Sequence, residues 1–217
     1  MDALVPQPLA YRDGDYFEAA NGSLVSKEAV VLGEENIYHV DGRLLVCARA
    51  VLRGDAARIS LGANVVIRSD VVLRPSPPPT AGTTKAASVP LVIGNFVVID
   101  EGAVVFAKSV GNFVRVGKKA ILGHGCVLED CVDVAPGAEV PPGAVIPAFT
   151  RVASPTPGAV AVRVCELLPC WKQCRSFEID DIFDSLHKLP AQHRSQTQQQ
   201  QQEKKTTGAQ STPHQQK

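Results

Sequence analysis

The sequence predicts an all-β solenoid: a single-stranded left-handed parallel β-helix of hexapeptide repeats, followed by a C-terminal α-helix and a disordered Gln-rich tail. A six-residue aliphatic period indicates the coil, because helices repeat every 3.6 residues and strands every two. The fifth position of each hexapeptide is small or branched, as a tight corner requires, and about three hexapeptides complete one triangular coil. The unbroken aliphatic positions are Val110, Val116, Leu122, Leu128, Val134, Val140, Ile146 and Val152.

The same period occurs earlier in the chain, with interruptions. A nine-residue step between Leu52 and Leu61 predicts an insertion at a corner. The pattern stops after Leu73, and the proline-rich residues 75–90 are expected to form a surface loop. A later step, from Val105 to Val110, is one residue short and predicts an irregularity near Lys108. The earlier aliphatic positions are Val40, Val46, Leu52, Leu61, Ile67, Leu73, Ile93, Ile99 and Val105.

Four segments follow from these patterns. Short strands between Tyr16 and Ile37 are expected to close the first coil, because a bare coil edge invites strand addition. A helix is expected to open at Ser176, with Phe177, Ile179, Ile182, Phe183, Leu186 and Leu189 on its apolar face, and to pack along the coils. The segments are 1–39 (N-terminal segment and cap), 40–154 (β-helix with loop 75–90), 155–190 (extension with the helix) and 191–217 (disordered tail).

Composition limits the classes of function. The formal net charge is +0, which gives no indication of nucleic-acid binding. No stretch approaches the ~20 apolar residues of a membrane span, and the first residues lack the basic start of a secretion signal. We therefore expect a cytoplasmic protein whose cysteines remain thiols.

One stretch resembles the gamma-class carbonic anhydrases. Residues 51–62, with Arg53-Gly54-Asp55, are similar to the first-coil signature of that group. Its three zinc-binding histidines would fall at Arg74, Glu101 and Phe106, none of which supplies an imidazole. The sequence therefore predicts no metal and no cofactor, and a zinc-free relative of this group remains an alternative.

A second alternative is a hexapeptide-repeat acyltransferase. Enzymes of that class generally use a histidine to deprotonate the attacking hydroxyl or amine, and His124 lies within the regular coils. Glu129 or Asp130 is nominated as its orienting partner by proximity in sequence alone. The neighbouring carboxylates of Asp100 and Glu101 would face opposite ways on a strand, so we expect no acid/base pair and two solvated side chains.

A third resemblance, to the dynactin subunit 5 family, covers residues 11–158. Matching stretches include 16–26, 32–37, 52–55, 71–75, 90–94, 127–131 and 140–147. The resemblance implies a non-catalytic cytoplasmic scaffold at the pointed end of dynactin. Its implied partners are a second β-helical subunit, an actin-related protein, the zinc-binding shoulder-proximal subunit and, indirectly, dynein and cargo adaptors.

Three residues are candidate partner-binding anchors: Phe96, Phe113 and Arg115. The two phenylalanines occupy the fourth position of their hexapeptides, which points outward, and an outward phenylalanine is costly unless it is covered. A partner is one possible cover. The loop at 75–90 or the C-terminal helix is the other.

Overall fold

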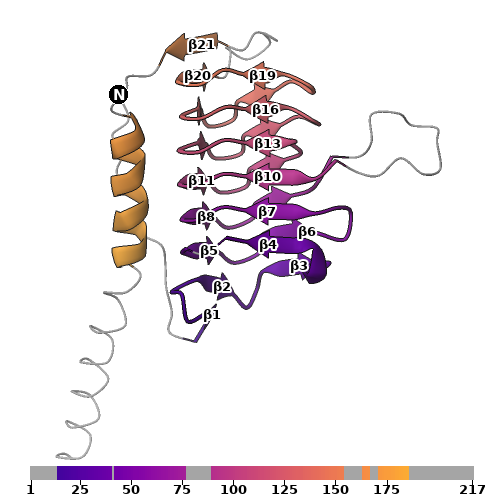
Figure 1. The fold of residues 1–217 in the computed structure, drawn as a ribbon, viewed down its shortest axis with the longest axis vertical. Helices are drawn as coiled ribbons and strands as arrows, with labels where there is room; N and C mark the ends of the chain where they lie inside the picture. The colour runs from indigo at the N-terminus through magenta and orange to yellow at the C-terminus, as the bar shows by residue number, and fades with distance from the viewer. Residues whose placement is uncertain (1–13, 41, 77–88, 154–162, 167–170, 186–217) are drawn as a thin grey trace, which may run out of the picture. The chain divides into compact units, whose positions relative to one another are not determined.

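The computed structural model describes residues 14–40, 42–76, 89–153, 163–166 and 171–185. The chain forms two compact units, of which one comprises residues 14–179 and the other residues 1–13 together with 180–217. All the coils lie in the first unit (Figure 1). The described part contains no helix long and apolar enough to cross a bilayer.

Three sheets form the sides of a parallel coil, and the predicted fold class is confirmed. Sheet A contains β1 (Tyr16–Glu18), β2 (Leu24–Ser26), β5 (Leu44–Val46), β8 (Val65–Ile67), β11 (Val97–Ile99), β14 (Arg115–Val116), β17 (Asp133–Val134), β20 (Thr150–Ala153) and β21 (Arg163–Glu166). Sheet B contains β3 (Val30–Leu32), β6 (Val51–Arg53), β9 (Val72–Leu73), β12 (Val104–Val105), β15 (Ile121–Leu122) and β18 (Glu139–Val140). Sheet C contains β4 (Ile37–His39), β7 (Ile59–Leu61), β10 (Leu91–Ile93), β13 (Ser109–Val110), β16 (Val127–Leu128) and β19 (Val145–Ile146).

Strand register follows the hexapeptide count. Val127 pairs with Val145, three hexapeptides further on, so residues at equivalent hexapeptide positions stack on one another in successive coils. The one-residue shortage falls between β12 and β13, where the chain bends at Lys108. Lys108 N–H still donates to Cys126 O at 2.9 Å, so the ladder continues through the predicted irregularity. The coils remain in register to the last repeat.

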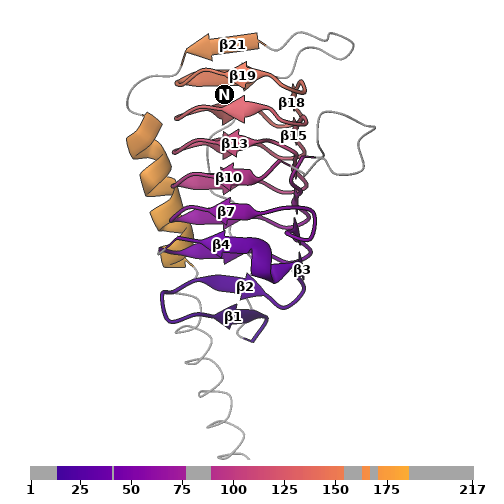
Figure 2. The same cartoon turned by 45° about the vertical axis from the view of Figure 1, so that its right-hand side comes forward.

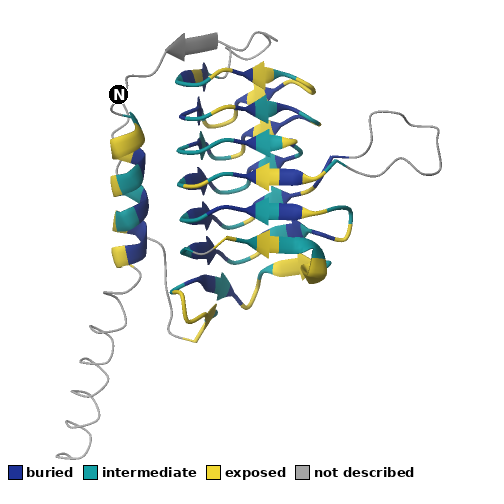
Figure 3. Cartoon of the chain, in the orientation of Figure 1, coloured by how far each residue is buried: buried dark blue, intermediate teal, exposed yellow. Residues whose placement is uncertain are grey.

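The core is a column of aliphatic side chains inside the coils. On each strand one residue points inward and its neighbour points outward, as on β15, where Leu122 is 0% exposed and Ile121 is 39% exposed. Leu122 stacks between Val105 and Val140, which are also buried. Figure 3 shows buried residues, in dark blue, recurring along the coils. Burying each such side chain contributes about 1.5–3 kcal/mol, and the contributions sum along the stack.

Among the described residues, each end of the coil is closed on sheet A alone. At the N-terminal end, β1 pairs antiparallel with β2, and at the C-terminal end β21 pairs antiparallel with β20. Figure 2 shows β1 beside β2 at one end of the coil and β21 at the other. Short strands do lie between Tyr16 and Ile37, but of these only β1 caps the coil. The parallel coils also include residues 24–39, which the sequence places in the N-terminal segment and cap, because β2, β3 and β4 already pair in parallel with the next coil. The aliphatic period is obscured there because an end strand buries fewer side chains.

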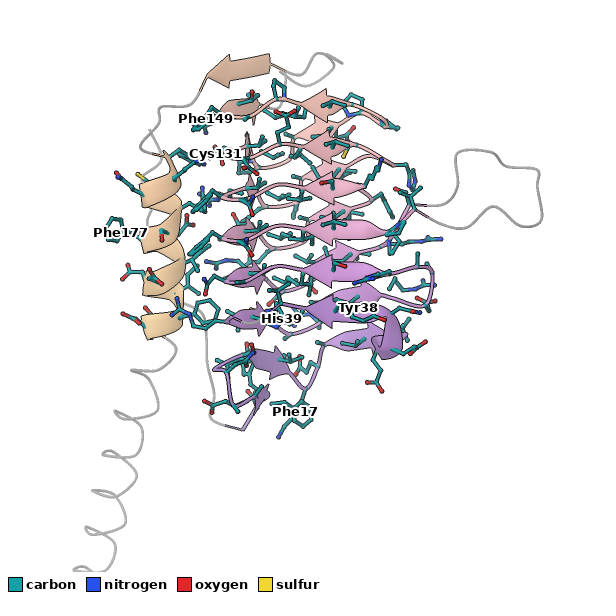
Figure 4. All side chains as sticks on the ribbon, in the orientation of Figure 1. Phe17, Tyr38, His39, Cys131, Phe149 and Phe177 are labelled. Atoms are coloured by element: carbon teal, nitrogen blue, oxygen red, sulfur yellow. The ribbon has the colours of Figure 1, made fainter. Side chains whose placement is uncertain are left out.

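The described part of the C-terminal helix spans residues 171–185, so the helix includes at least five residues before the expected start at Ser176. Phe177 is 74% exposed and points away in Figure 4, so its assignment to the apolar face was wrong. Leu186, Leu189, the tail at 191–217 and loop residues 77–88 lie outside the described residues. The loop base is described, with Ser76 bridged to Val89.

Candidate partner-binding surface

One corner of the coil carries a stack of aromatic side chains. Phe96, Phe113 and Phe149 occupy equivalent corner positions, with left-handed φ angles of 56°, 58° and 58°. The Phe96 and Phe113 rings are parallel, 3° apart, with centroids 5.0 Å from each other. A left-handed conformation costs about 1–2 kcal/mol for a residue with a Cβ, so the coil geometry has to impose it. We call these three residues and Cys131 the aromatic corner.

A lysine of the C-terminal helix lies over this corner. The Lys172 ammonium is 5.8 Å from the Phe113 ring centroid and 5.7 Å from that of Phe149, within the range of a cation–π contact. The start of the helix therefore covers part of the aromatic corner.

Cys131 fills the coil between Phe113 and Phe149. It shares the left-handed corner conformation, with φ 60°, and its side chain is buried (Figure 4). Burial raises the pKa of this thiol, although the charge of Lys172 lowers it. Cys131 is therefore a packed thiol at neutral pH rather than a nucleophile.

A buried carboxylate lies on the outer face of sheet A beside the corner. Asp100 is 3% exposed and accepts two hydrogen bonds from Arg115, at 3.0 and 2.9 Å. Arg68 Nε lies 3.2 Å from the other oxygen of Asp100, in an ion pair without hydrogen-bond alignment. Asp100 was expected to be solvated, and that was wrong because two arginines enclose its carboxylate.

Opposite charges alternate along the same face. Arg115, Asp133 and Arg151 are directly opposite one another on β14, β17 and β20. Burial raises the pKa of Asp133, more than the charges of Arg175 and Arg151 lower it. Burial likewise lowers the pKa of Arg175, which is 1% exposed and pairs with Glu178 on its own helix. This ionic layer lies between residues 171–179 of the helix and the strands.

The three sequence candidates thus lie next to one another. Phe96 and Phe113 stack at the corner, both partly exposed, and Arg115 is on the adjoining strand, with its side chain 24% exposed and paired with Asp100. The structure adds Phe149 and Lys172, which the sequence reasoning missed. Phe149 was detectable, because it lies three hexapeptides after Cys131, at the same corner position. No sequence signal pointed to Lys172.

The positions of the carbonic anhydrase zinc ligands have other contacts. Glu101 pairs with Lys118 at 3.0 Å, and the Phe106 ring lies 4.4 Å from that of His124. Arg74 is exposed. Within the part of the chain that the structure describes, no group of three His, Cys, Asp or Glu residues could hold a metal ion.

His124 does not approach either carboxylate nominated for it. Glu129 accepts from Ala148 N–H at 3.1 Å, and Asp130 accepts from Asn112 at 2.7 and 3.0 Å. Both line a shallow cavity of about 360 Å³, together with Ser109, Gly111, Val127, Leu128 and Ala148. His124 is not among the residues of this cavity. Among the described residues, neither Glu129 nor Asp130 is therefore the orienting group of His124 that general-base catalysis needs.

Coil, corner and covering helix together define a hexapeptide-repeat left-handed β-helix protein. The solved structures agree on this fold. A hexapeptide transferase family protein from Anaplasma phagocytophilum matches 75% of this chain and 92% of its own, with 18% identity and a TM-score of 0.50. The N-acyltransferase AntD from Bacillus cereus matches 74% of this chain and 89% of its own, with 12% identity and a TM-score of 0.54.

Sequence comparison identifies the family within this class. The family model for dynactin subunit 5 matches residues 6–179, and the chain belongs to that family. Dynactin subunit 5 of Dictyostelium discoideum is 34% identical over 106 residues, which are 49% of this chain and 52% of that protein. The match therefore spans about half the length of this curated relative.

Proposed function

We propose that this chain is a non-catalytic structural and adaptor subunit of the dynactin pointed end, which supports dynein-dependent engagement of cargo and membranes on microtubules. The observation that carries the proposal is the family match over residues 6–179, which includes all the coils and the start of the helix. The subunit acts in the cytoplasm, associated with the cytoskeleton. It requires no cofactor and no metal.

A rigid coil suits this role. Each strand is bonded to a neighbour on each side through most of the stack, so the faces bend little and hold surface side chains in fixed positions. In protein interfaces a few anchors supply most of the binding energy, and aromatic residues and arginine are enriched among them. Phe96 and Phe113, with Arg115 beside them, are the anchors we propose. The stacked rings are ordered before binding, which reduces the entropic cost.

The proposed partners are a second β-helical subunit, an actin-related protein and the zinc-binding shoulder-proximal subunit, with dynein and cargo adaptors engaged indirectly. A hexapeptide acyltransferase using His124 is the alternative, and the fold of AntD is the observation that favours it. The separation of His124 from Glu129 and Asp130 supports the structural role instead.

The test is a gentle purification of the tagged full-length chain from its own cells, with mass spectrometry of the co-eluting proteins. We expect actin-related proteins, a second β-helical subunit and dynein chains in one large particle. A homotrimer alone would contradict the proposal, and acyl transfer would then be assayed with and without His124→Ala.

A variant pair tests the proposed anchors in the same preparation. Phe96→Ser with Phe113→Ser should reduce the recovered partners severalfold, whereas Phe177→Ser, at a 74% exposed position, should not. A large fall in the melting temperature of the double variant would show that the rings act within the chain, under Lys172, rather than on a partner.

A further inference from the structure

The N-terminal end of the coil exposes more aliphatic and aromatic surface than a finished edge should. All three residues of β3 are exposed, with Val30, Val31 and Leu32 at 45%, 39% and 41%. Around them lie Phe17 at 64% and Tyr38 at 49%, both labelled at the lower part of Figure 4. We call β3, β4 and the β1–β2 hairpin the N-terminal edge.

Among the residues that the structure describes, the backbone of β3 is paired on one side only, since β3 is the last strand of sheet B. Val30 N–H donates to Ala50 O at 2.8 Å, and Leu32 O accepts from Asp55 N–H at 3.1 Å, both toward the next coil. Alternate residues of a parallel strand bond to opposite sides, so Val31, between these two, directs its N–H and C=O to the open side. This is the arrangement that accepts an added strand.

At the opposite end of the coil, β18 and β19 are likewise the last strands of sheets B and C, but their edges are blunted. There, β21 covers the end of sheet A, and the edge strands β18 and β19 are followed by Pro141, Pro142 and Pro147. Proline has no N–H to donate and blunts an edge. Prolines and β21 therefore protect the C-terminal end of the coil, whereas the N-terminal edge leaves aliphatic strand residues exposed. This difference indicates that a binding partner covers the N-terminal edge.

Charge decides what can cover it. Residues 14–40 carry five carboxylates and one lysine, and Glu18, Glu28, Glu34 and Glu35 are all exposed. The basic groups near the edge already have partners: Lys27 lies over Phe17 at 5.5 Å and Arg58 over Tyr38 at 4.1 Å. On the next coil, Arg49 pairs with Asp70 and Arg53 with Asp55. A second copy joined edge to edge would bring two acidic rims together, and a copy joined head to tail would meet the prolines and β21.

We propose that the N-terminal edge docks a β-strand of a different protein, aliphatic at its centre and flanked by lysine or arginine, which pairs with β3 and extends sheet B. The proposal rests on the proposed function in that the partner is a neighbouring subunit of the assembly. Val31 supplies the backbone hydrogen bonds, and Glu28, Glu34 and Glu35 meet the basic flanks.

Backbone variants of the full-length chain separate the open side of β3 from its paired side. Val31→Pro removes only the N–H that faces outward, and proline is tolerated in an edge strand. Val31→Thr keeps that N–H and is its matched control. Val30→Pro removes the N–H bonded to Ala50 and should lower the melting temperature, which Val31→Pro should not.

A photo-cross-linking amino acid at Leu32 then identifies the neighbour in cells, with the same group at Val145 as the control, since Val145 is 62% exposed on sheet C at the far end. We expect the Leu32 cross-link to fall on a strand with basic flanks in another protein. Val31→Pro should weaken that association about tenfold, as the loss of a hydrogen bond with added steric conflict implies. Glu34→Lys with Glu35→Lys should weaken it without touching the backbone.

A cross-link to this chain itself, or to a second copy of it, would overturn the proposal. Unchanged association of Val31→Pro and of the double glutamate variant would do the same. If the wild-type chain is absent from any particle with actin-related subunits, the proposed function fails. The Leu32 cross-link still decides the edge proposal in that case, because a basic-flanked strand supports it and the absence of a foreign strand contradicts it.

Discussion

Two aspartate–arginine pairs in this chain make similar hydrogen bonds, but one pair is buried and the other is exposed. Removing the aspartate should lower the stability of the protein at the buried pair and leave it unchanged at the exposed pair. Asp100 is 3% exposed and receives Arg115 at 3.0 and 2.9 Å. Asp70 receives Arg49 at 2.7 Å twice, but the two side chains are 51% and 62% exposed. Judged by hydrogen-bond length alone, the Asp70 pair should contribute more to stability. Judged by burial, the Asp100 pair should contribute more to stability.

The Asp100→Asn variant removes the carboxylate that pairs with both Arg68 and Arg115, and it leaves the buried Arg68 without its ion-pair partner. Breaking a buried ion pair by removing one partner costs about 3–5 kcal/mol. For a chain of this size, each kcal/mol corresponds to roughly 2–4 °C in Tm, so a fall of about 6–12 °C is expected at the lower bound. Asp70→Asn should leave Tm unchanged within error, because water already solvates both of its charges.

Thermal melts of the two variants and the wild type, at low and at high salt, check this prediction. The cost of Asp100→Asn should persist at high salt, since buried charges are poorly screened. Equal effects of the two substitutions, or a larger effect of Asp70→Asn, would refute the argument that burial rather than hydrogen-bond length determines the contribution of these pairs.

Three further predictions concern the core, the thiols and pH. Leu122→Ala should cost about 3 kcal/mol in chemical denaturation, while Ile121→Ala on the outer face of the same strand should cost less than half as much, and equal costs would contradict the inward assignment. At pH 8 iodoacetamide should label the exposed Cys174 well before Cys126, because burial raises the pKa of the Cys126 thiol to about 12. Peptide mass spectrometry follows the labelling, and early modification of Cys126 would contradict this prediction. Because burial raises the pKa of Asp133, its carboxyl group stays protonated in the folded state at pH values where the unfolded chain has released the proton. The Tm of the wild type relative to Asp133→Asn should therefore fall as pH rises from about 4 through the folded pKa. A relative Tm that rises over this range would contradict the prediction.

The coil architecture could be predicted from the sequence because each inward position stacks in the core and must therefore be aliphatic, which produces the six-residue period. Leu122 and Leu128 point inward as their spacing required, and the shortage before Val110 marks a real bend at Lys108. The earliest coil was missed because β3 has no neighbour on one side and buries little. A periodic pattern records burial, so it fades where burial ends.

The candidate surface was predictable only in part. Outward positions of Phe96 and Phe113 follow from their place in the hexapeptide, and their stacking follows from coil-on-coil register. The contact of Lys172 depends on how residues 171–179 lie against sheet A, and the enclosure of Asp100 depends on arginines of the two neighbouring coils. Contacts between segments distant in sequence are decided by packing, and a single sequence does not report them.

The central claim is that this chain works as one subunit of a large assembly. Sedimentation of the untagged endogenous chain from a clarified cell lysate through a density gradient tests it most directly. The account predicts that nearly all of the chain migrates with actin-related subunits in one large particle and that little remains at the size of a monomer or trimer. Migration at the size of a homotrimer, free of actin-related subunits, would contradict it.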